Sequence, residues 1–233
     1  MILDLSPDLR IQRRSLGNEG APLLIVDSLL VDPDRLVRKA ARSQFVPQSS
    51  MFPGIRANAP STYPRMLEQL LRPLLEEHFG LPRDGSLAFP MCHYSLVTTP
   101  PAQLAFLQRV PHIDSHAHNG LATVHYLFRG DWGGTAFYRH RSTGYEYVDH
   151  ARKLAYFTRL EEESRSEAAT PPGYIGDDTP LFERIDRVDA VFDRLVVYRR
   201  NSLHSGAIDN RNVPPPDPVA GRLSVNSFID VLD

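Results

Sequence analysis

The first third of the chain contains two segments in which apolar residues recur at helical spacing. In residues 61–80, STYPRMLEQLLRPLLEEHFG, apolar side chains lie three and four positions apart, which predicts a helix with one buried face. Gly80 stands where a left-handed residue would end this helix, and Pro73 is expected to kink it. Residues 32–42, DPDRLVRKAAR, predict a second helix with Asp32 as its N-cap.

Strand-like patterns dominate elsewhere. An apolar run precedes the helices, and from about residue 86 short segments rich in β-branched and aromatic residues are separated by Gly, Pro, Asn or Asp. The predicted strands are residues 21–30, 86–97, 121–130, 135–140, 182–188, 193–200 and 222–231. Helices followed by many short strands predict a mainly β protein, a sandwich or barrel with flanking helices on one face.

We expect residues 1–233 to form a single domain. Residues 1–85 would supply an N-terminal strand and supporting helices, and residues 86–233 would supply the β core. Residues 150–180 interrupt the strand pattern with a charged and then loop-like segment, which predicts an excursion from the sheet. This insertion is either a solvated helix and loop, or a lid over a pocket or a contact in a homodimer.

Composition narrows the class of protein. Hydrophobic residues make up 42% and charged residues 23% of the chain, as in ordinary globular proteins. The formal net charge of −2 gives no long-range attraction to nucleic acid or to an anionic membrane, so neither is expected as a partner. We expect no membrane span and no signal peptide, because no long apolar run is present and acidic residues stand where a signal peptide would have its basic region. Cys92 is the only cysteine, which excludes an internal disulfide, argues against a thiolate zinc site and favours a cytoplasmic location.

Candidate chemistry is concentrated in PHIDSHAHNG, residues 111–120, where His112, Asp114, His116 and His118 occupy alternate positions. His112 and Asp114 are two apart, so on a strand both side chains point to the same face. An imidazole and a carboxylate on one face form an economical pair of metal ligands. The residues alone leave open which of the four side chains would bind a metal.

A second polar feature lies near the end of the chain. Arg222, Ser224 and Asn226 alternate with apolar residues and share one face of the predicted strand over residues 222–231. An arginine on an otherwise apolar strand indicates an anion bound in the mouth of a barrel. An outward-facing salt bridge is the alternative.

Five short motifs follow one another in the second half of the chain. They are PHID (111–114), VHYLF (124–128), GGTAF (133–137), SLHSG (202–206) and GRLSV (221–225). In this order they resemble the iron(II)- and 2-oxoglutarate-dependent oxygenases, most of all the branch that contains prolyl hydroxylases and bacterial relatives of uncharacterised function. The resemblance covers about residues 86–230 and implies a double-stranded β-helix, or jelly-roll, core.

The resemblance implies that His112, Asp114 and His204 bind ferrous iron, with His116 and His118 in the turn that follows. Three protein ligands on one face leave positions open for a cosubstrate and oxygen. Because related halogenases replace the carboxylate by a small residue, the intact Asp114 favours hydroxylation or another oxidation of an unactivated C–H bond.

The resemblance also implies that Arg222 binds the distal carboxylate of 2-oxoglutarate, with help from the hydroxyl of Ser224. Tyr94 resembles a strand tyrosine that hydrogen-bonds the cosubstrate in prolyl hydroxylases. The spacing from His204 to Arg222 is longer than in many members of the superfamily, so Arg211 in the intervening loop is a rival for the same role.

The sequence alone leaves several points open. His125 and Tyr126 are neighbours on a strand, so one faces inward and the other outward. The substrate is a small molecule or a peptide or protein side chain. Two other functions are considered: a metallohydrolase that uses the whole cluster over residues 112–118, and a jelly-roll module that binds a ligand without turnover.

Overall fold

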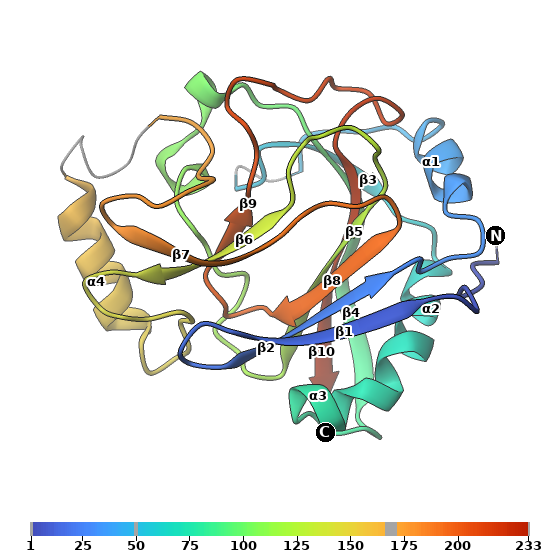
Figure 1. The fold of residues 1–233 in the computed structure, drawn as a ribbon, viewed down its shortest axis with the longest axis horizontal. Coiled ribbons are helices and arrows are strands. Elements are labelled where there is room, and N and C mark those ends of the chain that lie inside the picture. The colour runs from blue at the N-terminus through green and yellow to red at the C-terminus, as the bar shows by residue number, and fades with distance from the viewer. Residues whose placement is uncertain (1, 49–50, 166–171, 233) are drawn as a thin grey trace.

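A computed structural model describes residues 2–48, 51–165 and 172–232, which form two antiparallel sheets with helices outside them (Figure 1). The larger sheet has the strand order β1-β2-β8-β5-β10-β4-β3. Its strands are β1 (Arg10–Leu16), β2 (Ala21–Asp27), β3 (Gly54–Asn58), β4 (Ser86–Val97), β5 (Gly120–Tyr126), β8 (Arg194–Arg199) and β10 (Leu223–Leu232). The smaller sheet has the order β7-β6-β9, with β6 (Thr135–His140), β7 (Phe182–Val188) and β9 (His204–Gly206). This arrangement confirms the predicted mainly β, jelly-roll fold.

The larger sheet is apolar on both faces, which explains the continuous hydrophobic runs of its central strands. In β2, Leu24 and Val26 pack with the helices, whereas Leu23 and Ile25 pack between the two sheets. The space between the sheets also contains Phe137 from the smaller sheet. Two separate cores therefore hold the sheet, one under the helices and one inside the sandwich.

Three helices cover the outer face of the larger sheet, and a fourth lies beside the smaller sheet (Figure 1). They are α1 (Asp34–Ala40), α2 (Tyr63–Leu71), α3 (Leu75–Phe79) and α4 (Lys153–Ser164). Short 3-10 turns occupy Arg72–Leu74, Pro101–Gln103 and Phe106–Gln108. None of the helices in the described ranges is long and apolar enough to cross a bilayer.

The predicted helix over residues 61–80 is present but broken. Pro73 lies in the 3-10 turn that separates α2 from α3, because proline cannot donate the backbone hydrogen bond of a continuous helix. Gly80 ends α3 with a φ of 58°, the left-handed conformation that was predicted. The predicted N-cap of α1 is wrong: Pro33 occupies that position, and the Asp32 carboxylate instead accepts a hydrogen bond from Arg38 at 2.9 Å.

All seven predicted strands are present, although residues 21–30 and 121–130 end three and four residues early as strands. Three further strands, β1, β3 and β9, were not predicted. As a result, residues 1–85 contribute three strands to the larger sheet rather than one.

The excursion at residues 150–180 contains α4, which packs Tyr156 and Leu160 against the smaller sheet. His140 on β6 holds this helix, because its Nε2 lies 2.9 Å from the Glu163 carboxylate. Residues 166–171 lie outside the described part of the chain. The lid and the homodimer contact stay predictions.

A buried polar network connects the helices to the larger sheet. The two ring nitrogens of His125 lie 2.9 Å from the Tyr63 hydroxyl and 3.0 Å from one carboxylate oxygen of Asp193. The other carboxylate oxygen of Asp193 accepts the backbone N–H of Leu30 at 3.0 Å. His125 therefore faces the helices, which settles the open question of its orientation.

We expect His125→Leu to lower the free energy of unfolding by about 2–4 kcal/mol, because it leaves a buried carboxylate and a buried hydroxyl without their partner. Urea denaturation measures the change. The control His118→Leu replaces a histidine whose side chain is 66% exposed, and its effect should stay within about 0.5 kcal/mol. A loss below about 1 kcal/mol for His125→Leu would show that this network contributes little to stability.

Candidate metal centre

Backbone pairing brings distant parts of the chain together at the candidate metal centre. His112 and His204 exchange two backbone hydrogen bonds, of 2.9 and 3.0 Å, so the segment before β5 adds to the edge of β9. The Asp114 backbone N–H donates to the carbonyl of Arg200 at 2.8 Å. The segment over residues 112–114 is thus held at both ends, and its side chains take a fixed direction.

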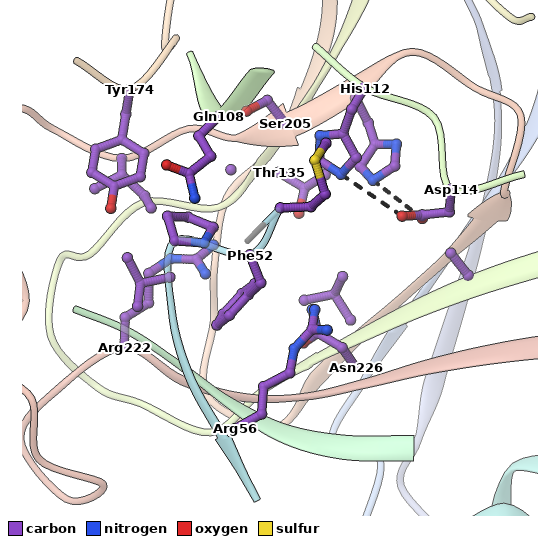
Figure 2. Close-up of a pocket in the computed structure, with 18 of the residues that line it drawn as sticks. Phe52, Arg56, Gln108, His112, Asp114, Thr135, Tyr174, Ser205, Arg222 and Asn226 are labelled. Atoms are coloured by element: carbon purple, nitrogen blue, oxygen red, sulfur yellow. Dashed lines mark ion pairs between the residues drawn. The ribbon is translucent and has the colours of Figure 1, made fainter. Parts of the chain in front are cut away.

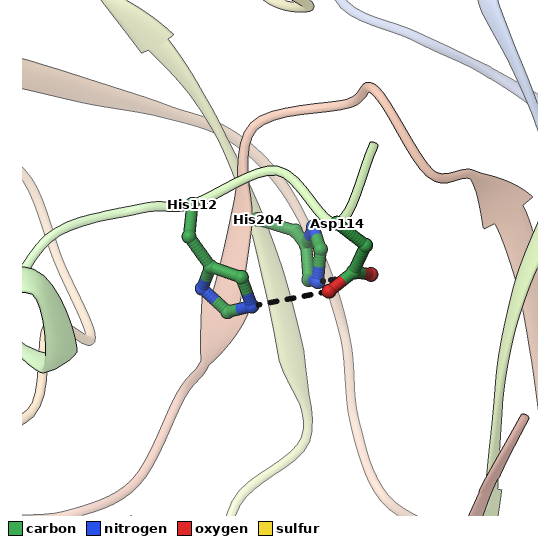
Figure 3. A group of neighbouring side chains, drawn as sticks. All are labelled: His112, Asp114 and His204. Atoms are coloured by element: carbon green, nitrogen blue, oxygen red, sulfur yellow. Dashed lines mark ion pairs between the residues drawn. The ribbon is translucent and has the colours of Figure 1, made fainter. Parts of the chain in front are cut away.

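The three side chains converge on one point (Figure 3). One potential ligand atom from each of His112, Asp114 and His204 lies within 4.8 Å of the other two. The Asp114 carboxylate oxygens lie 3.8 Å from Nε2 of His112 and 3.5 Å from Nε2 of His204. Only these three residues form such a cluster within the described ranges.

The hydrogen bond made by Nδ1 of His204 determines which ring nitrogen faces the cluster. This Nδ1 lies 3.0 Å from the carbonyl oxygen of Ser202 and donates a proton to it. Nε2 is therefore the nitrogen that faces the Asp114 carboxylate. A backbone partner on the far nitrogen is the usual support of a metal-binding histidine.

The electrostatic environment keeps these groups in forms suited to a metal. Burial, the adjacent His204 and the charge of Arg56 lower the pKa of His112 well below its usual range, although 42% of its side chain is accessible from the pocket. Its imidazole is therefore neutral, as a ligand must be. Burial raises the pKa of the Asp114 carboxyl, a shift that nearby positive charges oppose, as a divalent cation also would. The donor set of two imidazoles and one carboxylate fits a facial ferrous site.

The other two histidines of the PHIDSHAHNG stretch lie away from this cluster. His116 Nδ1 is 3.2 Å from the carbonyl oxygen of Val148, and His118 pairs with the Asp149 carboxylate at 3.3 Å. Both contact the segment that leads into α4. The four-residue cluster that a metallohydrolase would use is therefore not formed.

A pocket of about 120 Å³ opens beside the three side chains (Figure 2). This is roughly ten times the space that one water molecule needs, so the pocket admits a small organic molecule. Its wall includes Arg222 and Asn226 from the end of the chain, and Tyr174 from the 150–180 excursion. The pocket lies between the two sheets, in the mouth of the jelly roll.

Arg222 is a buried cation with no carboxylate partner in the described part of the chain, and only 6% of its surface is exposed. Its Nε donates to the carbonyls of Trp132 and Gly133 at 3.1 and 3.3 Å, and its Nη2 donates to the carbonyl of Gly134 at 2.8 Å. Carbonyl oxygens orient the guanidinium but do not neutralise it. A buried charge without a counter-ion is costly, so this site is suited to bind an anion.

The glycine pair of the GGTAF motif makes this arrangement sterically feasible. A Cβ atom on Gly133 would lie 1.8 Å from the carbonyl oxygen of Ala207, and one on Gly134 would lie 1.8 Å from that of Val188. Gly133 also has a φ of 71°, which side chains rarely adopt. Only glycine lets the turn approach both neighbouring segments while its carbonyls face Arg222.

The rival arginine does not reach the pocket. Arg211 lies in an exposed loop, where 90% of its side chain is accessible and its guanidinium pairs with Asp209 at 2.9 Å. Arg222 lines the same pocket as the three candidate ligands, and Arg211 does not. The geometry therefore favours Arg222 for anion binding.

Two predicted cosubstrate contacts are not found. Tyr94 faces the helices, where its hydroxyl donates to the carbonyl of Leu36 at 3.0 Å, so the predicted contact with a cosubstrate is wrong. Ser224 is buried beside the pocket, and its hydroxyl contacts the side-chain oxygen of Asn226 at 2.7 Å. Of these residues only Asn226 reaches the pocket wall.

Three other residues at the site were not predicted from the sequence. The ring of Tyr198 packs at a tilt against the candidate ligand His204, with ring centroids 4.6 Å apart. Thr135 lines the pocket and contacts the hydroxyl of Tyr126 at 2.6 Å, so Tyr126 is the neighbour of His125 that faces inward. Arg56 enters the pocket from β3, a strand whose sequence, GIRAN, carries no strand signal.

Fold and site together define a jelly-roll protein with a candidate metal centre built from a His-x-Asp pair and a distant histidine. A family model, described as a family of unknown function (DUF6445), matches residues 7–229, and the chain belongs to this family. No curated protein matches the sequence.

Several solved structures match the chain over most of its length at low sequence identity. HygX from Streptomyces hygroscopicus, solved with nickel and 2-oxoglutarate bound, matches with a TM-score of 0.51 at 12% identity, covering 90% of this chain and 82% of HygX. The 2-oxoglutarate-dependent epimerase SnoN from nogalamycin biosynthesis gives a TM-score of 0.47 at 16% identity, covering 90% and 78%. The carbocyclase SnoK from the same biosynthesis gives 0.44 at 9%, covering 90% and 79%. The likeness to HygX shows that the two chains share a fold.

We expect Asp114→Ala and His204→Ala to weaken the binding of a divalent ion at least about 100-fold, because each removes a ligand and leaves two. Titration with Ni(II), followed by calorimetry and by metal content after dialysis, measures the loss. His118→Ala should bind like the unmodified protein. Metal retention by Asp114→Ala equal to that of the His118→Ala control would mean that the ligands are assigned wrongly.

Proposed function

We propose that this protein is a non-haem iron(II)- and 2-oxoglutarate-dependent dioxygenase that hydroxylates or otherwise oxidises an unactivated C–H bond. One observation carries the proposal: a cluster of two imidazoles and a carboxylate shares a small pocket with a buried, uncompensated guanidinium. The two halves of this site match the two needs of such an enzyme, a metal with open positions and an anchor for a dicarboxylate.

In this proposal His112, Asp114 and His204 hold the ferrous ion, and Arg222 binds the distal carboxylate of 2-oxoglutarate. Nickel and 2-oxoglutarate bound in HygX support the pairing of metal and cosubstrate on this fold. Iron and 2-oxoglutarate together supply the oxidation by O₂, so the protein's part is to bind, orient and exclude water.

The chain's own groups perform these tasks in defined ways. The carbonyls of residues 132–134 hold Nε and Nη2 of Arg222, while its Nη1 has no hydrogen-bond partner among the described residues. That edge of the guanidinium is free to donate to a carboxylate. The aromatic faces of Tyr126 and Phe128 lie within 5.8 and 5.6 Å of the Arg222 charge and stabilise it without neutralising it.

The metallohydrolase is not proposed, since His116 and His118 are engaged elsewhere. A jelly-roll module that binds 2-oxoglutarate without turnover is the remaining alternative. Turnover and binding must therefore be measured separately.

The first expected outcome is turnover: with Fe(II), ascorbate and oxygen, the protein should convert 2-oxoglutarate to succinate, which mass spectrometry detects. Omission of iron and the Asp114→Ala variant should both reduce succinate to background, because each removes the metal centre. Tight binding of 2-oxoglutarate to the nickel-loaded protein without any succinate from the iron-loaded protein would favour the non-catalytic module.

The second expected outcome concerns the anchor. Arg222→Leu should weaken 2-oxoglutarate binding to the nickel-loaded protein by on the order of 10- to 100-fold, the worth of a charge-assisted hydrogen-bonded pair. Calorimetry measures this affinity, and Arg211→Leu serves as the matched control because its guanidinium lies outside the pocket. The opposite ranking of the two variants would transfer the role to Arg211.

A further inference from the structure

A second arginine enters the same pocket and is not explained by cosubstrate binding. Arg56 lies on β3 at the edge of the larger sheet, opposite Ser95 on β4. Its Nε donates to the Ser95 hydroxyl at 3.2 Å, and its guanidinium carbon lies 4.2 Å above the ring of Phe52. Figure 2 shows this side chain directed into the pocket from one side while Arg222 enters from another.

The guanidinium of Arg56 is held in place but has no counter-ion. Apart from the bond to Ser95, none of its nitrogens has a hydrogen-bond or ion-pair partner among the described residues. Ser95 and Phe52 fix one edge and one face, which leaves the edge with Nη1 and Nη2 open to the pocket. This edge has the geometry that binds a carboxylate through two parallel hydrogen bonds.

Burial lowers the pKa of Arg56 and raises the pKa of the Asp114 carboxyl, and the opposite charge of each residue opposes the shift of the other. The two do not form an ion pair, however, and Asp114 contacts the two imidazoles instead. If Asp114 binds the metal, the metal compensates its charge. Arg56 then needs another anion.

The charge balance of the pocket also indicates that Arg56 needs another anion. Among the described residues that line it, Arg56 and Arg222 are cationic and Asp114 is anionic, and the two histidines would be neutral as metal ligands. A divalent ion and the 2-oxoglutarate dianion cancel each other. The loaded pocket therefore keeps one positive charge, which a single carboxylate would neutralise.

Besides the two arginines the pocket is lined by both polar and apolar side chains, and its apolar lining includes Phe52, Met91 and Phe228. We propose that Arg56 binds the carboxylate of the substrate, and that the substrate is a small carboxylic acid with an apolar body that lies against these three side chains. This inference rests on the proposed function, because Arg222 must be occupied by the cosubstrate.

The test uses the full chain loaded with Ni(II) and 2-oxoglutarate, which permits binding without turnover. The probes are two matched pairs, 3-phenylpropanoate with 3-phenylpropanamide and hexanoate with hexanamide, which differ in charge but hardly in shape. Broadening of the probe proton signals by the paramagnetic ion gives the dissociation constant of each probe. The unmodified protein should bind each carboxylate at least about tenfold more tightly than its amide.

Arg56→Met should weaken carboxylate binding by about 10- to 100-fold and leave amide binding unchanged, because it removes the charge and keeps an apolar side chain over Phe52. The carboxylate affinity of Arg56→Lys should lie between those of the unmodified protein and Arg56→Met, since lysine keeps the charge and loses the planar guanidinium. Arg38→Met, in an exposed arginine of α1 paired with Asp32, should match the unmodified protein. Circular dichroism establishes that each variant is folded.

Carboxylates that bind no more tightly than amides, or a preference that survives Arg56→Met, would overturn the inference. The affinity for 2-oxoglutarate separates this failure from failure of the proposed function. Arg56→Met should keep an affinity for 2-oxoglutarate within about twofold of the unmodified value. If Arg56→Met lost this affinity and Arg222→Leu kept it, Arg56 would be the cosubstrate anchor and the inference would be overturned. If the unmodified protein binds no 2-oxoglutarate, the proposed function fails, and the same probe pairs with nickel alone decide whether Arg56 selects carboxylates.

Discussion

The reciprocal backbone hydrogen bonds between His112 and His204 are the constraint on which the site depends. These residues are far apart in the sequence, and neither lies in the interior of a long strand. The pairing sets the distance between their side chains, and the carbonyl of Arg200 fixes Asp114 in turn. Side-chain convergence is therefore a consequence of main-chain pairing, which resists change in the surrounding side chains.

The charges of the pocket are organised around this constraint. A lone carboxylate lies beside two imidazoles, and two guanidinium groups enter the same pocket without pairing with it, one from β3 and one from the residue before β10. In an apolar sandwich, each of these cations carries a desolvation cost that protein atoms alone do not offset. The arrangement makes physical sense when a metal ion and anionic ligands complete it.

Much of the fold could be predicted from the sequence because the central strands and the helices under them carry strong hydrophobic patterns. The strands that escaped prediction have weak patterns for physical reasons: β1 is an exposed edge strand, and β9 has only three residues. Asp32 failed as an N-cap because the helix starts one residue later than the Asp-Pro signal suggested. Local sequence indicates a helix start well, but its register is decided by packing.

The residues of the site likewise divide into those that could be predicted and those that could not. The convergence of His112, Asp114 and His204 and the position of Arg222 could be anticipated, because motif order carried the information. The orientation of Tyr94 could not, since one face of β4 packs under the helices and the other lines the pocket, and a tyrosine suits either face. Arg56 was invisible for a different reason, because its role depends on which strand becomes the neighbour of β4.

The backbone hydrogen bonds that hold Arg222 determine which changes in sequence would displace it. Main-chain oxygens of residues 132–134 hold the guanidinium, so no side chain that could be lost by a single substitution is required to position it. Sequence drift in the surrounding strands would leave the arginine where it is, whereas lengthening or shortening the turn would displace it. The length of this turn and its two glycines, rather than the surrounding side chains, therefore keep Arg222 at the pocket wall.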